Sequence, residues 1–126
     1  MNDLNCQNRC PVELALDVVG GKWKPLILYR LSRGTLRFGQ LQRAIPDVSQ
    51  RMLTLHLREL ERDGVVRRHV FPEVPPKVEY SLTEPAKHLV PILEELGTWL
   101  REHGSALEAL RVSSGQMTLD REERAE

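Results

Sequence analysis

Four polar side chains in the middle of the chain, Gln50, Arg51, Thr54 and Arg58, have types and spacing suited to binding nucleic acid. Gln and Arg carry the paired donors and acceptors that match the edges of adenine and guanine. Arg58 and Arg62 lie further along the same segment, where they could pair with phosphates. The same pattern also fits an ordinary amphipathic helix with a solvated basic face, and that alternative stays open.

Cys10 is the second group with potential chemistry, because it directly precedes Pro11 and so falls at the start of an expected helix. Unpaired N–H groups and the helix dipole favour a thiolate there, and Arg9 and Lys22 could add positive charge. The alternative is a small, half-buried cap residue. With Cys6 as the other cysteine and no matched Cys/His pair, we expect no zinc or other metal site.

The other residues that could take part in catalysis do not form a catalytic motif, which argues against an enzyme. The four histidines follow no motif, and Gly20-Gly21 lacks the pattern of a phosphate-binding loop. His56 falls on the basic helix, where we expect a groove or surface residue and not a base. We expect no cofactor. A small thiol enzyme using Cys10 would need a base beside the thiol and turnover of a substrate.

Composition limits the class of protein. The 126 residues, with 40% hydrophobic residues, predict one globular domain. No apolar run approaches the roughly 18 residues of a membrane helix, and the N-terminus does not read as a secretory signal, so we expect a cytoplasmic protein. The net charge is zero, yet 13 Lys and Arg stand against 7 Asp and Glu between Lys22 and His88. This basic middle is expected to meet a polyanion.

Four helices are expected in the first half of the chain. Apolar spacing and Pro or Gly punctuation predict helices over 11–19, 25–31 and 38–45, of which the second is apolar on most sides and should be the most buried. The tight turn Pro46-Asp47-Val48 then leads to a fourth helix that ends at Asp63.

The fourth helix carries the polar cluster. Ser49 is a suitable N-cap, and Gly64 suits the left-handed position after the last turn. At about 100° per residue, Leu53, Leu57 and Leu60 form a buried stripe. The basic side chains lie on the opposite side, so two short helices and a tight turn place this face where it can enter a major groove.

After Gly64 the pattern changes to the period of two strands, over 65–71 and 78–82. The proline-rich segment between them predicts a two-stranded hairpin with a stiff tip. Arg67 and Arg68 on the first strand suit a phosphate or minor-groove contact, or else one of them pairs with Glu79 across the ladder. Thr83 can cap a final helix, in which Pro91 predicts a kink or a frayed first turn.

Several spaced motifs occur together over roughly residues 10 to 100. They are Cys10-Pro11, Gly20-Gly21-Lys22-Trp23, Arg37-Phe38, Ile45-Pro46, Met52-Leu53-Thr54, Leu57-Arg58-Glu59-Leu60-Glu61, Asp63-Gly64, Val74-Pro75-Pro76-Lys77-Val78-Glu79-Tyr80 and Leu82-Thr83. In combination they resemble the HxlR-type family of bacterial transcriptional regulators.

The resemblance implies a winged helix-turn-helix dimer that binds operator DNA. The helix after Ser49 would be the recognition helix, and Pro75-Pro76-Lys77 the tip of the wing. Members usually carry Arg at the position of Lys77, and Lys keeps the charge without the planar fork. Some members use the cysteine at the position of Cys10 to sense oxidants or electrophiles, and Cys6 is then a possible resolving thiol. Other members keep this cysteine without a sensing role.

The last helix carries a wide apolar stripe that includes Leu93, Leu96, Trp99 and Leu100. A domain of this size can cover only part of it, so a second copy is the expected cover. Packing against the first helix is the alternative, and both can hold on different faces. A two-fold dimer would read half-sites roughly 34–36 Å apart, which predicts a partly palindromic operator.

The sequence therefore predicts a mostly α, α+β fold: a winged helix-turn-helix with a two-stranded β-hairpin wing and flanking N- and C-terminal dimerisation helices. It should occupy residues 10–112, between a flexible tail over 1–9 and a disordered tail over 113–126. The expected base contacts are Gln50, Arg51 and Thr54, and the expected phosphate or wing contacts are Arg58, Arg37 and Lys77. For Arg37 an intramolecular salt bridge is the alternative.

The expected function is that of a homodimeric, sequence-specific, double-stranded DNA-binding regulator. Repression is adopted because it is the commoner outcome in the family that the chain resembles. The effector, whether oxidant, electrophile or small molecule, stays open. A winged-helix module that binds protein instead of DNA is the main alternative; its principal interaction would survive neutralisation of Arg51 and Arg58.

Overall fold

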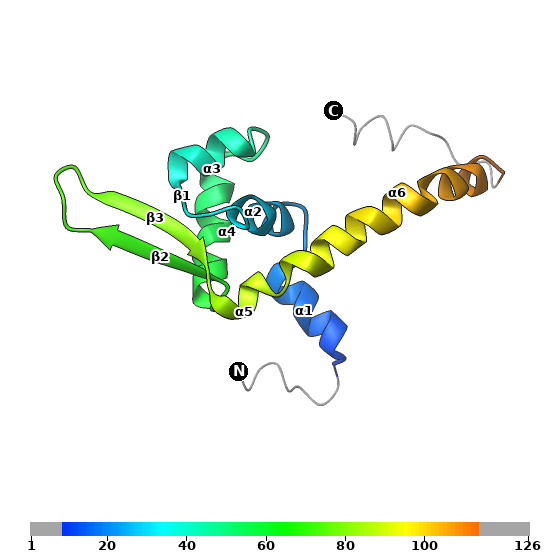
Figure 1. Ribbon diagram of the computed structural model, residues 1–126, viewed down its shortest axis with the longest axis horizontal. Coiled ribbons are helices and arrows are strands. Elements are labelled where there is room, and N and C mark those ends of the chain that lie inside the picture. The colour runs from blue at the N-terminus through cyan, green and yellow to red at the C-terminus, as the bar shows by residue number, and fades with distance from the viewer. Residues whose placement is uncertain (1–8, 114–126) are drawn as a thin grey trace. The chain divides into compact units, whose positions relative to one another are not determined.

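The computed structural model describes residues 9–113 (Figure 1). Its elements are α1 (Pro11–Val19), α2 (Trp23–Leu31), β1 (Leu36–Arg37), α3 (Phe38–Ala44), α4 (Gln50–Arg62), β2 (Val66–Phe71), β3 (Lys77–Leu82), α5 (Glu84–Lys87) and α6 (Val90–Ser113). The chain divides after Val90 into two compact units, the second of which holds α6. The tails expected over 1–9 and 113–126 lie outside the described residues except at their inner ends, where Arg9 pairs with Asp17 and Ser113 closes α6.

The first unit is built around α2. Ile27 and Leu28 are fully buried, and α2 packs against α3, α4 and β3. The prediction that this is the most buried helix is confirmed, since α2 buries Lys24, Ile27, Leu28 and Leu31 and the longer α4 buries three residues. The helix begins at Trp23, two residues before Pro25. Lys24 is 8% exposed and is the one charged side chain buried among residues 9–113. The first turn of α2 therefore places a cation in the core.

The helix-turn-helix forms as expected. The tight turn is held by the Val48 N–H, which donates to the Ile45 carbonyl, and by the Gln42 amide, which donates to the Val48 carbonyl at 2.8 Å. Ser49 caps α4 by accepting from the Met52 N–H at 3.1 Å. At the other end Gly64 has φ +79°, a left-handed conformation that glycine adopts without steric cost.

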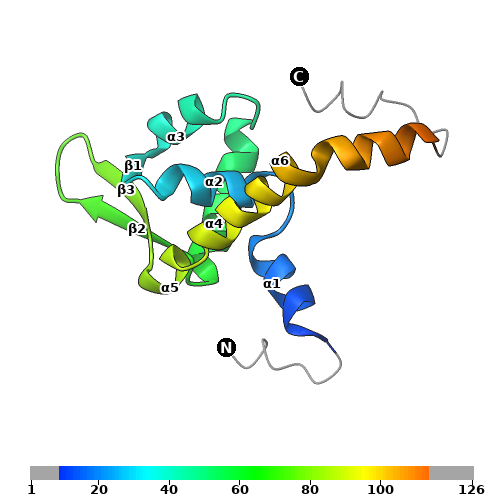
Figure 2. The same ribbon diagram turned by 45° about the vertical axis from the view of Figure 1, so that its right-hand side comes forward.

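The sheet has three strands, so the prediction of a two-stranded hairpin was incomplete. Strand order is β1-β3-β2, and all pairs are antiparallel. The added strand β1 is two residues long, pairing Leu36 with Tyr80 and Arg37 with Glu79. A segment this short shows no alternating period from which it could be predicted. The β2–β3 hairpin itself extends away from α2, α3 and α4 in both views (Figure 1; Figure 2).

The expected single helix after Thr83 is divided in two. The short α5 ends at Lys87, and α6 begins at Val90, with Pro91 in its first turn, where a missing N–H costs nothing. Thr83 stands at the N-cap position but does not cap, because its hydroxyl donates to the Gly64 carbonyl at 2.8 Å. Within residues 9–113, no helix combines the length and the apolar character needed to cross a membrane.

Candidate nucleic-acid interface

One side of α4 packs into the core. Leu53, Leu57 and Leu60 are at most 2% exposed, which confirms the predicted stripe. The opposite side therefore points to solvent, and its exposed residues are Gln50, Arg51, Met52, Leu55 and Arg58. Neither Arg51 nor Arg58 forms an ion pair with another described residue, so both guanidinium groups are available to a ligand.

Thr54 lies at the edge of this exposed face and is half-buried. Its hydroxyl donates to the Gln50 carbonyl at 2.8 Å, one turn earlier in the helix. The hydroxyl proton is thus used inside α4, and the oxygen lone pairs remain for a donor. A base contact by Thr54 would accept from an amino group, such as N6 of adenine or N4 of cytosine.

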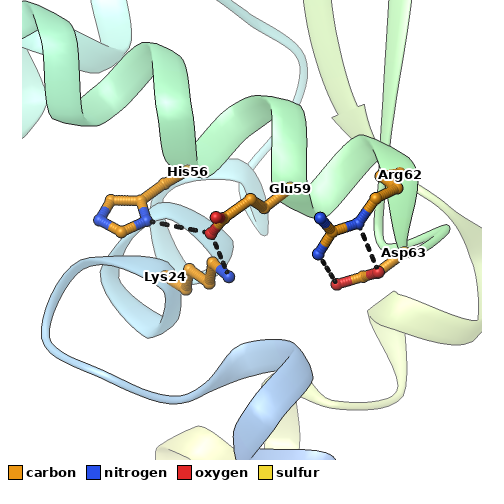
Figure 3. Close-up of polar contacts among 5 residues, drawn as sticks. All are labelled: Lys24, His56, Glu59, Arg62 and Asp63. Atoms are coloured by element: carbon orange, nitrogen blue, oxygen red, sulfur yellow. Dashed lines mark hydrogen bonds and ion pairs between the residues drawn. The ribbon is translucent and has the colours of Figure 1, made fainter.

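A polar cluster ties the other flank of α4 to α2 (Figure 3). Lys24 Nζ lies 2.7 Å from Glu59 Oε1. The hydrogen bond from Lys24 lowers the pKa of the Glu59 carboxyl below its ordinary value, and burial partly opposes the shift. Because the cation is buried and its partner is on α4, the pair links α4 to α2.

His56 belongs to this cluster, so the expectation that it faces a groove or solvent is wrong. Its side chain is 17% exposed, and Nδ1 lies 3.7 Å from Glu59 Oε1, beyond hydrogen-bond distance (Figure 3). That nitrogen is buried and has no hydrogen-bond partner among the described residues. The flank of α4 that carries His56 and Glu59 is accordingly turned toward α2 and away from any ligand of Arg51.

Arg62 and Arg37 differ in whether an acidic side chain pairs with them. The Arg62 guanidinium lies 3.2 Å from the Asp63 carboxylate and donates a hydrogen bond to it. This hydrogen bond raises the pKa of Arg62. Arg62 is therefore partly neutralised, although it was considered for a phosphate contact. Arg37 is exposed at the start of α3, and its backbone N–H donates to Gln40 Oε1. It forms no ion pair with another described residue, so the described part of the chain lends no support to the salt-bridge alternative.

The exposed arginines of the wing, Arg67 and Arg68, lie on β2 and not at its tip. Lys77 is half-buried, with Nζ 3.4 Å from Glu79 Oε2 and 4.6 Å from the centre of the Phe71 ring. The idea that Glu79 pairs with Arg67 or Arg68 is wrong, because His69 stands opposite Glu79 and Glu79 binds Lys77. Both arginines are exposed.

Cys10 occupies the N-cap of α1, as expected. Its Sγ accepts from the Glu13 N–H at 3.4 Å, and the residue is exposed. The two expected sources of positive charge are engaged elsewhere: Arg9 pairs with Asp17 and Glu13, and the Lys22 ammonium lies over the Trp23 ring. Cys6 lies outside the described residues. The thiol is thus accessible and touches the helix N-terminus.

Most of the large apolar residues of α6 are exposed in the described part of the chain. No residue of this helix is buried; Leu96 is 63% exposed, Trp99 and Leu100 are about half exposed, and Leu93 is half-buried. The Trp99 and His103 rings are 5.8 Å apart along the same face. In the first unit, α1 likewise exposes Val12 and Leu16 and buries only Leu14.

A helix pair joined by a tight turn, followed by a projecting hairpin, defines a winged helix-turn-helix protein. The family model described as HxlR-like helix-turn-helix matches residues 18–108. The chain belongs to this family, whose members are transcriptional regulators and not enzymes. It is 51% identical over 102 residues to the HTH-type transcriptional regulator YybR of Bacillus subtilis, covering 81% of this chain and 82% of the relative.

Solved structures agree with this assignment. The redox regulator HypR in its reduced form is 50% identical, with a TM-score of 0.74 over 79% of this chain and 99% of the other. The reduced form of the transcriptional regulator YodB from Bacillus subtilis is 40% identical, with a TM-score of 0.66 over 73% of this chain and 91% of the other. The mostly helical α+β winged fold is therefore shared with structures of regulators.

Proposed function

We propose that the protein is a cytoplasmic, homodimeric repressor that binds a partly palindromic operator and responds to oxidants through Cys10. The observation that carries this proposal is the division of α4 into two sides. The leucine side and the Lys24–Glu59 pair hold the helix, while Gln50, Arg51 and Arg58 remain exposed. A helix held in this way can present side chains to a groove without reorganising the core.

The proposed DNA contacts are chosen by whether each side chain is exposed and whether an acidic residue already pairs with it. Gln50, Arg51 and Thr54, near the start of α4, are assigned to bases, and Arg58 and Arg37 to phosphates. For the wing, Lys77 keeps a role at the tip only if DNA displaces its Glu79 partner. Arg67 and Arg68 on β2 are exposed and form no ion pair with another described residue, although Arg67 interacts electrostatically with Glu84. We add both to the wing contacts.

The homodimer is proposed from the uncovered apolar faces. Leu96, Trp99 and Leu100 on α6 form an exposed patch of the kind that marks a protein interface. A second copy offers an identical patch, and a two-fold interface is self-complementary by construction. Two copies also supply two recognition helices, which an operator of two half-sites requires.

A redox response is supported by the exposed Cys10 and by the solved relatives. HypR is described as a redox regulator in oxidised and reduced forms, and YodB in reduced and diamide-treated forms. We propose that two Cys10 thiols of a dimer, or Cys10 and Cys6 of one chain, join in a disulfide. The two thiols lose two protons and two electrons, which an oxidant such as diamide accepts. A non-oxidising electrophile or another small molecule is the alternative effector.

Fluorescence anisotropy with DNA flanking the protein's own gene tests the proposal. We expect nanomolar affinity, a steep loss of affinity with salt, and much weaker binding to an unrelated duplex. Diamide should abolish this binding, thiol should restore it, and Cys10→Ser should be insensitive, with Cys6→Ser separating the two possible disulfides. Added protein should also reduce transcription in vitro from a promoter that overlaps the bound site.

Weak binding that is indifferent to sequence, for that DNA and for duplexes selected from a random pool, would contradict the proposal. In that case the protein-binding alternative would gain support, and neutralising Arg51 and Arg58 would leave the partner interaction intact. Specific binding that diamide leaves unchanged would remove the redox role of Cys10 alone.

A further inference from the structure

Two apolar side chains lie exposed in the middle of the polar side of α4. Leu55 is 45% exposed and Met52 is 36% exposed, although the helix buries three other leucines. Leu55 follows Met52 by three residues and Arg51 by four, and it precedes Arg58 by three. Residues at these separations are neighbours on a helix surface. The two apolar side chains therefore form a small patch bordered by two arginines.

The fold does not account for this patch. Leu53, Leu57 and Leu60 attach α4 to the core, and the Lys24–Glu59 pair secures its other flank. Neither Leu55 nor Met52 is buried against these groups, so neither adds to the interior. A single exposed leucine is ordinary on a protein surface. A pair of apolar side chains at the centre of the proposed DNA-reading surface calls for an apolar partner in the ligand.

The surrounding charge identifies the ligand. Arg51 and Arg58 have no acidic partner among the described residues, which favours a polyanion over an apolar protein surface. Duplex DNA presents its base edges in the major groove as hydrogen-bonding groups, with a methyl group only at thymine. The groove feature that fits an apolar patch between two arginines is therefore the 5-methyl group of thymine.

We infer that Leu55, assisted by Met52, is a specificity-determining residue that packs against a thymine methyl group in each operator half-site. The inference rests on the proposed DNA binding and deepens it. It assigns a thymine to each half-site, next to the base that Arg51 contacts. The energy comes from removing the methyl group and the leucine side chain from water together.

The test uses an operator selected by the full-length protein from synthetic random duplexes, in which thymine is the one source of a methyl group. Each thymine of the half-site is replaced in turn by deoxyuridine, which removes the methyl group and keeps every hydrogen-bonding group. At one position we expect a loss of affinity of about four-fold per half-site, or about fifteen-fold when both half-sites are changed.

Leu55→Ala should lose most of the preference for thymine over deoxyuridine, because the main side chain that packs on the methyl group is gone and only Met52 remains beside it. Leu26→Ala is the matched control, since Leu26 is 40% exposed on α2 and lies outside the proposed contact. It should keep the wild-type ratio of the two affinities. Because Leu55 is exposed, the thermal midpoint of Leu55→Ala should stay within a few degrees of wild type.

Three results would overturn the inference. If specific binding is found and no deoxyuridine substitution weakens it, thymine methyl groups are not read, while the proposed function stands. If Leu55→Ala and Met52→Ala both keep the full preference for thymine, another group or the shape of the DNA is responsible. If selection yields no preferred sequence, the proposed function and this inference fail together.

Discussion

Helices α4 and α6 both carry leucines at helical spacing, but among the described residues only the leucines of α4 are buried. The leucine stripe of α4 is fully buried, whereas α6 has 24 residues and buries none. The difference shows that an apolar stripe predicts a covered face without revealing whether the cover belongs to the same chain. We infer that α4 is positioned by its own fold and that α6 is completed by a second copy.

The largest effect is expected from a substitution in the buried leucine stripe of α4. Leu57→Ala should lower the free energy of unfolding by about 2–5 kcal/mol, because it leaves a cavity in a packed core. Urea denaturation at low protein concentration measures it. Leu96→Ala on α6 is the control and should change the same quantity by less than about 0.5 kcal/mol when the protein is monomeric. Equal losses in the two variants would mean that α6 is covered within one chain.

The next largest effect is expected from a substitution in the exposed apolar face of α6. Trp99→Ala should weaken dimerisation by about 2–4 kcal/mol, since large aromatic anchors dominate interfaces. Sedimentation equilibrium measures the dimer dissociation constant. Ser105→Ala, which lies on the other side of α6 by helical spacing, should leave it unchanged. If Trp99→Ala does not alter the dissociation constant, the dimer contact lies elsewhere. If the wild type is itself monomeric, the proposed dimer is wrong.

A smaller effect is expected from a substitution on the exposed side of α4. Arg51→Ala should cost about 1–3 kcal/mol in operator binding and relax the preference at one base pair. Arg62→Ala should cost less and leave base preference intact, because Asp63 already holds that guanidinium. Anisotropy titrations against single-base operator variants report both quantities. Unchanged affinity and base preference in Arg51→Ala would refute the proposed docking of α4.

The smallest effect concerns the ion pair between Lys24 on α2 and Glu59 on α4. Lys24 lowers the pKa of Glu59 below its ordinary 4.5, so the carboxylate stabilises the folded state above that pH. This contribution is lost as pH falls through the lowered value. Glu59→Gln should therefore be less stable than wild type by about 1 kcal/mol at neutral pH, with the gap closing in acid.

Urea denaturation from pH 7 to pH 3 follows this gap. Glu84→Gln is the comparison, because Glu84 also has a lowered pKa but pairs with Lys87 on the surface, where solvent screens the interaction. Its difference from wild type should be smaller at every pH. A Glu59→Gln difference that stays constant down to pH 3 would show that the carboxyl does not link stability to protonation.

The ends of α4 and its buried leucine stripe could be predicted because they depend on nearby residues. Ser49 caps the first turn and Gly64 adopts the left-handed conformation that its position requires. The leucine stripe follows from helical spacing alone. Each of these features is settled within one or two turns of chain, so the segment itself carries the information.

What could not be predicted depends on residues far apart in the chain. Strand β1 exists because Leu36 meets Tyr80, a pairing that neither short segment reveals. His56 was placed on the wrong flank because helical spacing gives angles but does not show where α2 will lie. The burial of Lys24 has the same origin, since its partner Glu59 lies on a different helix.

Hydroxyl-radical footprinting on the selected operator tests most directly that α4 reads DNA while α6 joins two copies. We expect two protected tracts of equal length, related by two-fold symmetry, with centres about 10–10.5 base pairs apart on one face of the duplex. Trp99→Ala should lose both tracts together at concentrations where wild type protects fully. A single tract, or protection without symmetry, would contradict the account.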